Sequence, residues 1–147
     1  EIEHLTCFKI ESANAASKIR ALIKNCSQKL DAPFDGEESI TLYADLEAGI
    51  SGSMSSALLP EKIAPVIDHF WNNEKDKAEE VYNSILPLIN FENRQCGFRA
   101  TKTVMKEGGV IKSDFCRDPI KPLDLDTKNL LLNFAKRYDL LTYKWGK

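Results

Sequence analysis

Along roughly the first seventy residues, apolar positions recur with two spacings: every second residue in some segments, and every third or fourth residue in others. In LTCFKI, residues 5–10, Leu5, Cys7 and Lys9 share one face of an extended chain, and the other face is also largely apolar. Apolar residues on both faces are typical of a strand covered on both sides, so we expect the Lys9 face to be interior. Similar reasoning predicts extended segments at 32–34 and 50–56 and helices at 13–29, 37–47 and from Pro60 to about 72.

Strand signals disappear after residue 72, and helical spacing takes over. Helices are predicted at 74–92, at 93–107 and from a capping Asp126, with a glycine pair at 108–109 and an open connector in between. We therefore predict an α/β fold in which residues 1–72 alternate strands and helices and residues 73–147 form a helical domain. The pattern leaves two architectures open: a small open three-layer sheet, or the closing part of a (β/α)8 barrel.

Composition narrows the class of partner. The 147 residues carry a net charge of -2 with no long run of like charge, which argues against nucleic acid and against a polybasic membrane patch. The four cysteines form no CxxC pair and the two histidines have no ligand spacing, so no metal site is expected. Cys7 and Cys26 lie on apolar faces, which predicts buried reduced thiols and a cytoplasmic protein.

Lys9 has two interpretations. A lysine at a strand end usually extends its amine into water, and the residue type alone favours that reading. The second interpretation is a catalytic amine. The position of Lys9 on the same face as Leu5 and Cys7 favours it, because an amine on an interior face is desolvated, its pKa falls and the neutral nucleophile becomes available. In a parallel α/β fold this position also lies at the carboxyl end of a strand, where sites are built.

Other polar segments have adequate structural explanations. FDGEES, residues 34–39, reads as a turn glycine and a helix start, or as backbone N–H groups that hold an anion. GISGSMSS, residues 49–56, is either a plain strand or a loop kept small for a substrate. ENRQ, residues 92–95, fits a solvated helix face better than an interface. Phe70, Trp71 and Tyr82 are predicted to be core residues.

The order of these segments resembles a known superfamily. FKIES, FDGEES, LEAGISGSMSSALLP and EKDKAEEVYNSILPLI are similar, in sequence order, to motifs in the carboxyl-terminal half of the dihydrodipicolinate synthase / N-acetylneuraminate lyase superfamily. The string NRQCGFRATKTVMKEGGVI resembles its subgroup of 2-keto-3-deoxy sugar acid dehydratases. The resemblance implies strands six to eight of a (β/α)8 barrel followed by a C-terminal helical domain.

That resemblance also implies a chemistry. Lys9 falls at the Schiff-base position, and Gly36, Glu38, Gly52 and Ser53 at positions that line the substrate's hydroxyl side. The expected reaction dehydrates L-2-keto-3-deoxyarabonate to α-ketoglutarate semialdehyde, without cofactor or metal, in a homo-oligomer, commonly a tetramer. The alternatives are a pyruvate-dependent aldolase, a dihydrodipicolinate synthase, or an inactive half-barrel.

The resemblance leaves part of the family's machinery unmatched. The family's carboxylate-binding threonine pair and its proton-relay tyrosine lie on earlier strands that have no counterpart in this sequence. The chain starts at Glu1, without Met and almost directly in a strand. We therefore expect it to be a piece of a longer protein.

Overall fold

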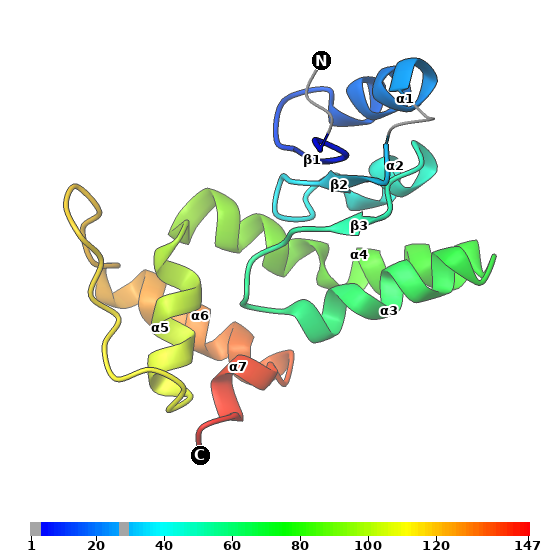
Figure 1. Ribbon diagram of the computed structural model, residues 1–147. Coiled ribbons are helices and arrows are strands. Elements are labelled where there is room, and N and C mark those ends of the chain that lie inside the picture. The colour runs from blue at the N-terminus through cyan, green and yellow to red at the C-terminus, as the bar shows by residue number, and fades with distance from the viewer. Residues whose placement is uncertain (1–3, 27–29) are drawn as a thin grey trace. The chain divides into compact units, whose positions relative to one another are not determined.

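The computed structural model describes residues 4–26 and 30–147, and a small parallel sheet lies at the start of the chain. Its strands are β1 (Cys7–Ile10), β2 (Ala32–Asp35) and β3 (Gly52–Ser53), hydrogen-bonded in the order β1-β2-β3 (Figure 1). Helix α1 (Ala15–Cys26) connects the first two strands and α2 (Leu42–Glu47) the last two. The predicted alternation of parallel strands and helices is confirmed, although the end of the first predicted helix, at 27–29, lies outside the described residues.

The remainder of the described chain is helical. Its elements are α3 (Pro60–Trp71), α4 (Lys75–Phe91), the π-helix η1 (Glu92–Cys96), α5 (Arg99–Glu107), α6 (Leu125–Arg137) and α7 (Leu141–Lys144). The predicted cap of α6 is corrected by two residues, because Asp124 accepts a hydrogen bond from the Thr127 backbone N–H at 2.9 Å. Within the described ranges no helix is long and apolar enough to cross a membrane.

The contacts divide the chain into two compact units. Unit 1 contains Glu1–Ser55 and Pro65–Asn83, and unit 2 contains Ser56–Ala64 and Ser84–Lys147. Each unit has its own buried apolar residues, among them Ile19, Leu42, Leu46, Val66 and Ala78 in unit 1, and Leu58, Leu88, Ile89, Val104 and Leu131 in unit 2. The boundary at residue 72 between barrel part and helical domain stays a prediction.

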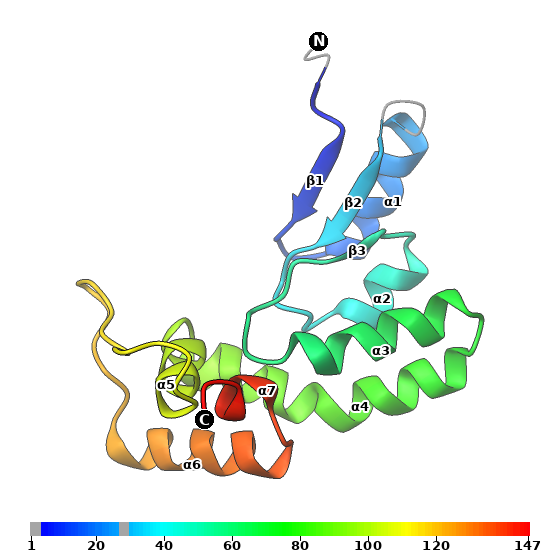
Figure 2. The same ribbon diagram turned by 60° about the horizontal axis from the view of Figure 1, so that its bottom comes forward.

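Within unit 1, the faces of β1 differ from the prediction. Helices α1 and α2 lie on one side of the sheet (Figure 2), and on β1 the alternate residues Phe8 and Ile10 are half-buried. Leu5 is 50% exposed and the Cys7 thiol is exposed, so the face expected to be interior is the open one. Cys26 is exposed too, which corrects the prediction of two buried thiols. The described helices of unit 1 cover only the opposite face.

In unit 2, the glycine pair does more than end α5. A Cβ on Gly108 would lie 2.0 Å from the Thr142 carbonyl oxygen, so only glycine allows α7 to approach this closely. The Gly146 N–H donates to the Gly108 carbonyl at 2.9 Å, and the Thr142 hydroxyl donates to the Leu58 carbonyl at 2.8 Å. These bonds attach the last helix to the unit's core.

Candidate functional site

The carboxyl ends of the three strands meet at one edge of the sheet in unit 1. Lys9 lies beside Phe34, and Phe34 beside Gly52, in one row across the sheet. The next row is formed by Ile10, Asp35 and Ser53. Because side chains alternate along a strand, the first row faces the open side and the second the helix-covered side.

Lys9 stands on the open side with its amine paired. Its Nζ lies 2.9 Å from Glu11 Oε2, and its side chain is 35% exposed. The hydrogen bond that Lys9 donates to Glu11 raises the pKa of Lys9 above its ordinary value, against a smaller lowering by burial. The prediction that desolvation lowers this pKa is therefore wrong for the structure, because the partly open amine has an acidic partner.

Two predicted glycines border this row. A Cβ on Gly36 would lie 2.7 Å from Lys9 Cγ and 2.8 Å from the Ile10 carbonyl oxygen, so the backbone of Gly36 lies directly against the lysine stem. A Cβ on Gly52 would lie 2.9 Å from the Phe34 ring. Both positions exclude larger residues because of close approach, Gly36 to Lys9 itself and Gly52 to the aromatic ring next to it.

Glu38 lies on an unusual turn between β2 and α2. Glu38 and Ser39 follow each other with φ of 52° and 67°, the left-handed region that non-glycine residues rarely adopt. Such conformations persist where the surrounding structure imposes them, often at functional sites. The helix predicted from residue 37 therefore begins only at Leu42, because the turn replaces its first residues.

The Glu38 carboxyl is electrostatically coupled to Lys9. Burial raises the pKa of Glu38, and the positive charge of Lys9 opposes that rise. Its Oε2 atom is buried and has no hydrogen-bond partner among the described residues. A carboxyl group with a raised pKa and a free oxygen beside an amine is suited to exchange protons with a third group bound between them.

Ser53 lies on the other side of the edge. Its hydroxyl donates to Asp35 Oδ2 at 2.7 Å and lies 2.9 Å from the Ser39 hydroxyl. Asp35 Oδ1 accepts from the Glu37 backbone N–H at 3.3 Å. The structure therefore brings Lys9, Gly36 and Glu38 together and places Ser53 in a buried polar cluster. A substrate contact by Ser53 stays a prediction.

Two members of this cluster come from helices. Asp45 of α2 is fully buried and accepts from the Thr41 hydroxyl at 2.8 Å, while burial and the neighbouring Asp35 raise its pKa to about 6. Tyr82 of α4 donates its hydroxyl to the Ser39 carbonyl at 3.0 Å and to the Ile40 carbonyl. Burial raises the pKa of Tyr82 to about 12, so it remains a donor.

The sequence interpretation missed most of this cluster. Asp35, Ser39 and Asp45 were not singled out, and Tyr82 was expected only as a core residue, which its burial confirms. One signal was present, because Asp35 is a carboxylate at the last position of a strand otherwise made of Ala, Pro and Phe. Among the other predicted core aromatics, Trp71 is 56% exposed, which corrects that expectation.

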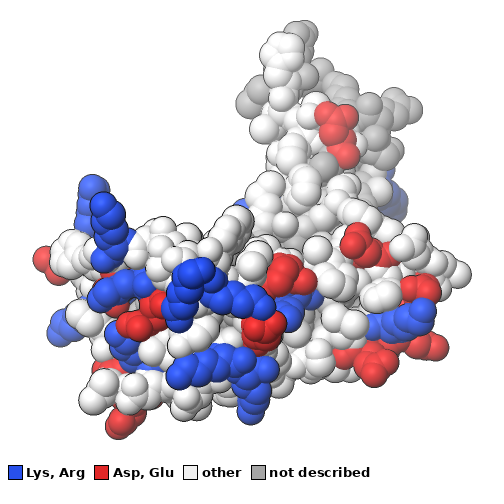
Figure 3. Space-filling model, turned by 90° about the horizontal axis from the view of Figure 1, so that it is seen from below, with Lys and Arg blue, Asp and Glu red and all other residues white. Residues whose placement is uncertain are grey.

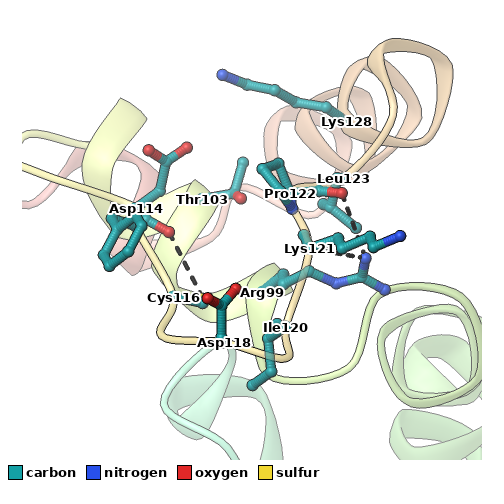
Figure 4. Close-up of a pocket in the computed structure, with 11 residues that line it drawn as sticks. Arg99, Thr103, Asp114, Cys116, Asp118, Ile120, Lys121, Pro122, Leu123 and Lys128 are labelled. Carbon is teal, nitrogen blue, oxygen red and sulfur yellow. Dashed lines mark hydrogen bonds between the residues drawn. The ribbon is translucent and has the colours of Figure 1, made fainter.

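Unit 2 contains a separate pocket of about 450 Å³ (Figure 4). It lies between α5, α6 and the 111–124 connector, and none of the predicted site residues lines it. Arg99 borders it, but its Nη1 donates to the carbonyls of Lys121 at 3.0 Å and Pro122 at 3.4 Å. The guanidinium is therefore engaged in holding the connector.

The surface of unit 2 is also rich in charge. Lys and Arg outnumber Asp and Glu there, and many of them are visible in Figure 3, whereas acids predominate in unit 1. Several of these cations are paired, as Lys106 is with Asp114 and Lys128 with Glu107. The solvated reading of residues 92–95 holds for the exposed Arg94 and Gln95. It is wrong for Glu92, which is buried and accepts from the Ser56 hydroxyl at 2.5 Å.

Sequence and structure comparisons identify the relatives of this chain. The L-2-keto-3-deoxyarabonate dehydratase of Azospirillum brasilense is 44% identical over 146 residues, covering 99% of this chain and 47% of that protein. The 4-hydroxy-tetrahydrodipicolinate synthase of Geotalea daltonii is 26% identical over 145 residues. The crystal structure of dihydrodipicolinate synthase from Aquifex aeolicus superposes with a TM-score of 0.82 at 20% identity, covering 95% of this chain and 47% of that one.

These matches define what is shared. The chain spans about half the length of the curated relatives it matches. The solved structure from Aquifex aeolicus shares the fold of this chain. Residues 1–137 match the Dihydrodipicolinate synthetase family directly. The chain belongs to the Dihydrodipicolinate synthetase family.

Proposed function

We propose that this chain carries the Schiff-base lysine of a class I lyase that dehydrates a 2-keto-3-deoxy sugar acid. The substrate we infer is L-2-keto-3-deoxyarabonate, and the product α-ketoglutarate semialdehyde. The observation that carries the proposal is the placement of Lys9 against Gly36 and within electrostatic reach of Glu38 at one sheet edge. The 44% identity to a relative named for this substrate supports the choice.

The proposal includes a position in a larger fold. We infer that β1, β2 and β3 correspond to strands six, seven and eight of a (β/α)8 barrel, with residues 73–147 as its C-terminal helical domain. Active sites of such barrels lie at the carboxyl ends of the strands, which is where Lys9 and Glu38 are found. The full assembly would be a homo-oligomer, with a tetramer as the expected form.

Lys9 supplies the covalent step. The neutral amine attacks the C2 ketone, and loss of one water gives an iminium that draws electrons from C3. Removal of a C3 proton gives an enamine, which expels the C4 hydroxyl as a second water when that oxygen is protonated. Loss of a C5 proton from the resulting conjugated iminium gives an enol, and protonation at C4 converts that enol to the C5 aldehyde. Protonation at C3 restores the iminium, whose hydrolysis consumes one water and releases the semialdehyde. The net change is the loss of one water from the sugar acid.

Glu38 is the group we assign to the departing hydroxyl. Its raised pKa keeps a larger fraction protonated than for an ordinary glutamate, which suits a general acid. Its Oε2 is buried and has no hydrogen-bond partner among the described residues, so we infer that this oxygen is available to the substrate hydroxyl once the turn admits the substrate. Gly36 allows the lysine stem to pass, and Gly52 accommodates the Phe34 ring beside it.

Turnover assays on the protein that contains this sequence test the proposal. With L-2-keto-3-deoxyarabonate, we expect semialdehyde formation, and Lys9→Ala should reduce kcat/KM by roughly 10⁴-fold or more, the scale on which loss of a covalent nucleophile acts. Lys24→Ala, which removes an exposed lysine of α1, is the matched control and should retain activity. Release of pyruvate and glycolaldehyde would instead identify an aldolase, and full turnover by Lys9→Ala would refute the assignment.

A further inference from the structure

The left-handed turn that carries Glu38 has two backbone hydrogen bonds of its own, from Ile40 N–H to the Glu37 carbonyl at 3.0 Å and from Leu42 N–H to the Ser39 carbonyl at 3.4 Å, and buried side chains attach it to the rest of unit 1. Its backbone carbonyls at Ser39 and Ile40 accept from Tyr82, and its Glu37 N–H is bound by Asp35. The side chain of Ser39 contacts Ser53 at 2.9 Å. None of these contacts is required by the lyase chemistry described above, and all of them end on the turn.

The hydrogen bonds have a defined direction. Ser53 has one hydroxyl proton and donates it to Asp35, so the bond between the two serines is donated by Ser39. Asp35 thus accepts on both oxygens, from the Ser53 hydroxyl on Oδ2 and from the Glu37 N–H on Oδ1. An ionised carboxylate can accept both bonds, and an amide in its place could accept only one of them.

Asp45 has the opposite requirement. Its Oδ2 accepts from Thr41, while Oδ1 is buried and finds no donor among the described residues. The Asp35 side chain lies beside it and raises the pKa of Asp45, together with burial, to about 6. A proton on Oδ1 would be donated toward Asp35, so the two fully buried acids are best satisfied when they share one proton.

We propose that Tyr82, Asp35 and Asp45 are positioning residues that hold the turn at residues 36–41, so that Glu38 faces Lys9. The inference rests on the proposed function, because the group that these three residues position is Glu38, the general acid proposed there. They touch neither Lys9 nor the open face of the sheet through any hydrogen bond of the structure. The hydrogen bonds of Tyr82 and Asp35 act on the reaction through the turn, and the charge of Asp35 additionally raises the pKa of both Lys9 and Glu38.

The test compares Tyr82→Phe with Tyr43→Phe in the protein that contains this chain. Tyr43 stacks on Tyr82 with 6.4 Å between ring centroids, and its hydroxyl makes only a 3.5 Å bond to the Lys75 carbonyl. Amide hydrogen exchange in residues 37–42 should accelerate by about ten-fold or more in Tyr82→Phe and remain unchanged in Tyr43→Phe. This readout needs no catalytic activity.

Kinetics separate positioning from a purely structural role. In Tyr82→Phe, kcat should fall by about ten-fold or more with KM within about two-fold. The part of the pH dependence of kcat that reflects titration of Glu38, the proposed general acid, should also move. Imine formation between Lys9 and pyruvate, measured by borohydride trapping, should persist. If exchange accelerates but kcat and the pH profile do not change, the positioning role is refuted.

Other outcomes are equally decisive. Equal exchange in the two tyrosine variants overturns the inference. Absence of any imine in the parent protein overturns the proposed function, while the exchange comparison still decides whether the cluster holds the turn. If Tyr82→Phe does not fold, Asp45→Asn and Asp35→Asn replace it: exchange at 37–42 should stay slow in the first and accelerate in the second, and the reverse order would overturn the inference.

Discussion

At the carboxyl ends of the strands in unit 1, the open face and the helix-covered face of the sheet differ in how their polar groups are bonded. On the open face, Lys9 is paired with Glu11, and Glu38 nearby has a buried oxygen without a hydrogen-bond partner among the described residues. On the helix-covered face, Ser53 donates to the fully buried Asp35, and Tyr82 donates to the Ser39 carbonyl of the turn. The contrast indicates that the proposed acid keeps an unsatisfied oxygen, while Asp35 and Tyr82, which hold its turn, are bonded.

The largest expected effect is at Gly36, which packs against both the Lys9 side chain and the Ile10 backbone. In Gly36→Ala the new Cβ would overlap Lys9 Cγ and the Ile10 backbone, so strand and turn must move apart. Overpacking of this kind lowers the free energy of unfolding by about 1–3 kcal/mol, and imine formation at Lys9 should slow as well. Gly97→Ala is the control, since a Cβ there meets no atom within 4 Å and its φ of 61° adds backbone strain far from Lys9 in the sequence. Equal loss of imine formation in both variants would contradict this account.

Substitutions of the two buried acids, Asp35 and Asp45, test the helix-covered face. Asp35→Asn leaves either the Ser53 hydroxyl or the Glu37 N–H without an acceptor, and should destabilise by about 1–3 kcal/mol. Asp45→Asn imitates the protonated acid, since it accepts from Thr41 and donates toward Asp35, so its stability at neutral pH should match or exceed that of the parent. Denaturant unfolding of both variants measures the difference, and equal destabilisation would exclude the shared proton.

The same pair predicts a pH dependence of stability. The pKa of Asp45 is raised from 3.8 to about 6 in the folded state, so the folded protein retains a proton that the unfolded chain has released in that window. The contribution of Asp45 to the free energy of unfolding should therefore fall as pH rises from about 4 to 6, by an amount on the order of 2 kcal/mol. Asp45→Asn should lose this dependence. A parent and variant with the same pH profile would contradict it.

The smallest effect belongs to the open face. Because the hydrogen bond that Lys9 donates to Glu11 raises the pKa of Lys9, Glu11→Gln should lower that pKa and move the rise of imine formation to lower pH. The pair is partly exposed, so a displacement of less than about one pH unit is expected. The pH profile of pyruvate imine formation measures it. A displacement to higher pH would show that Glu11 does not stabilise the charged amine.

The order of elements could be predicted from the sequence because apolar spacing encodes it. The residues of β1 and the stripe of α1 alternate with periods of two and of three to four, and both elements form where expected. The same pattern placed Lys9 at a strand end but predicted its face to be interior, whereas that face is exposed; the family resemblance singled out Lys9 as the Schiff-base residue, which stays a prediction. The family motif FDGEES likewise indicated Gly36 and Glu38, which lie against or near Lys9.

The remainder depended on tertiary contacts that no local pattern encodes. Residues 37–41 read as a helix start, yet the bonds to Asp35 and Tyr82 impose left-handed conformations at Glu38 and Ser39. The raised pKa of Asp45 depends on its burial and on the neighbouring Asp35, which is ten residues earlier in the sequence. The ionisation of Lys9 was predicted in the wrong direction because the helices of unit 1 cover the other face of β1 and Glu11 lies within 2.9 Å.

Borohydride reduction in the presence of pyruvate tests the central claim most directly. The protein that contains this chain would be reduced, digested and analysed by mass spectrometry. The account predicts one stable adduct, carried by the peptide that contains Lys9 and lost in Lys9→Ala. An adduct on any other lysine, or no adduct under conditions in which the protein turns over its keto acid, would contradict the assignment of Lys9 as the Schiff-base residue.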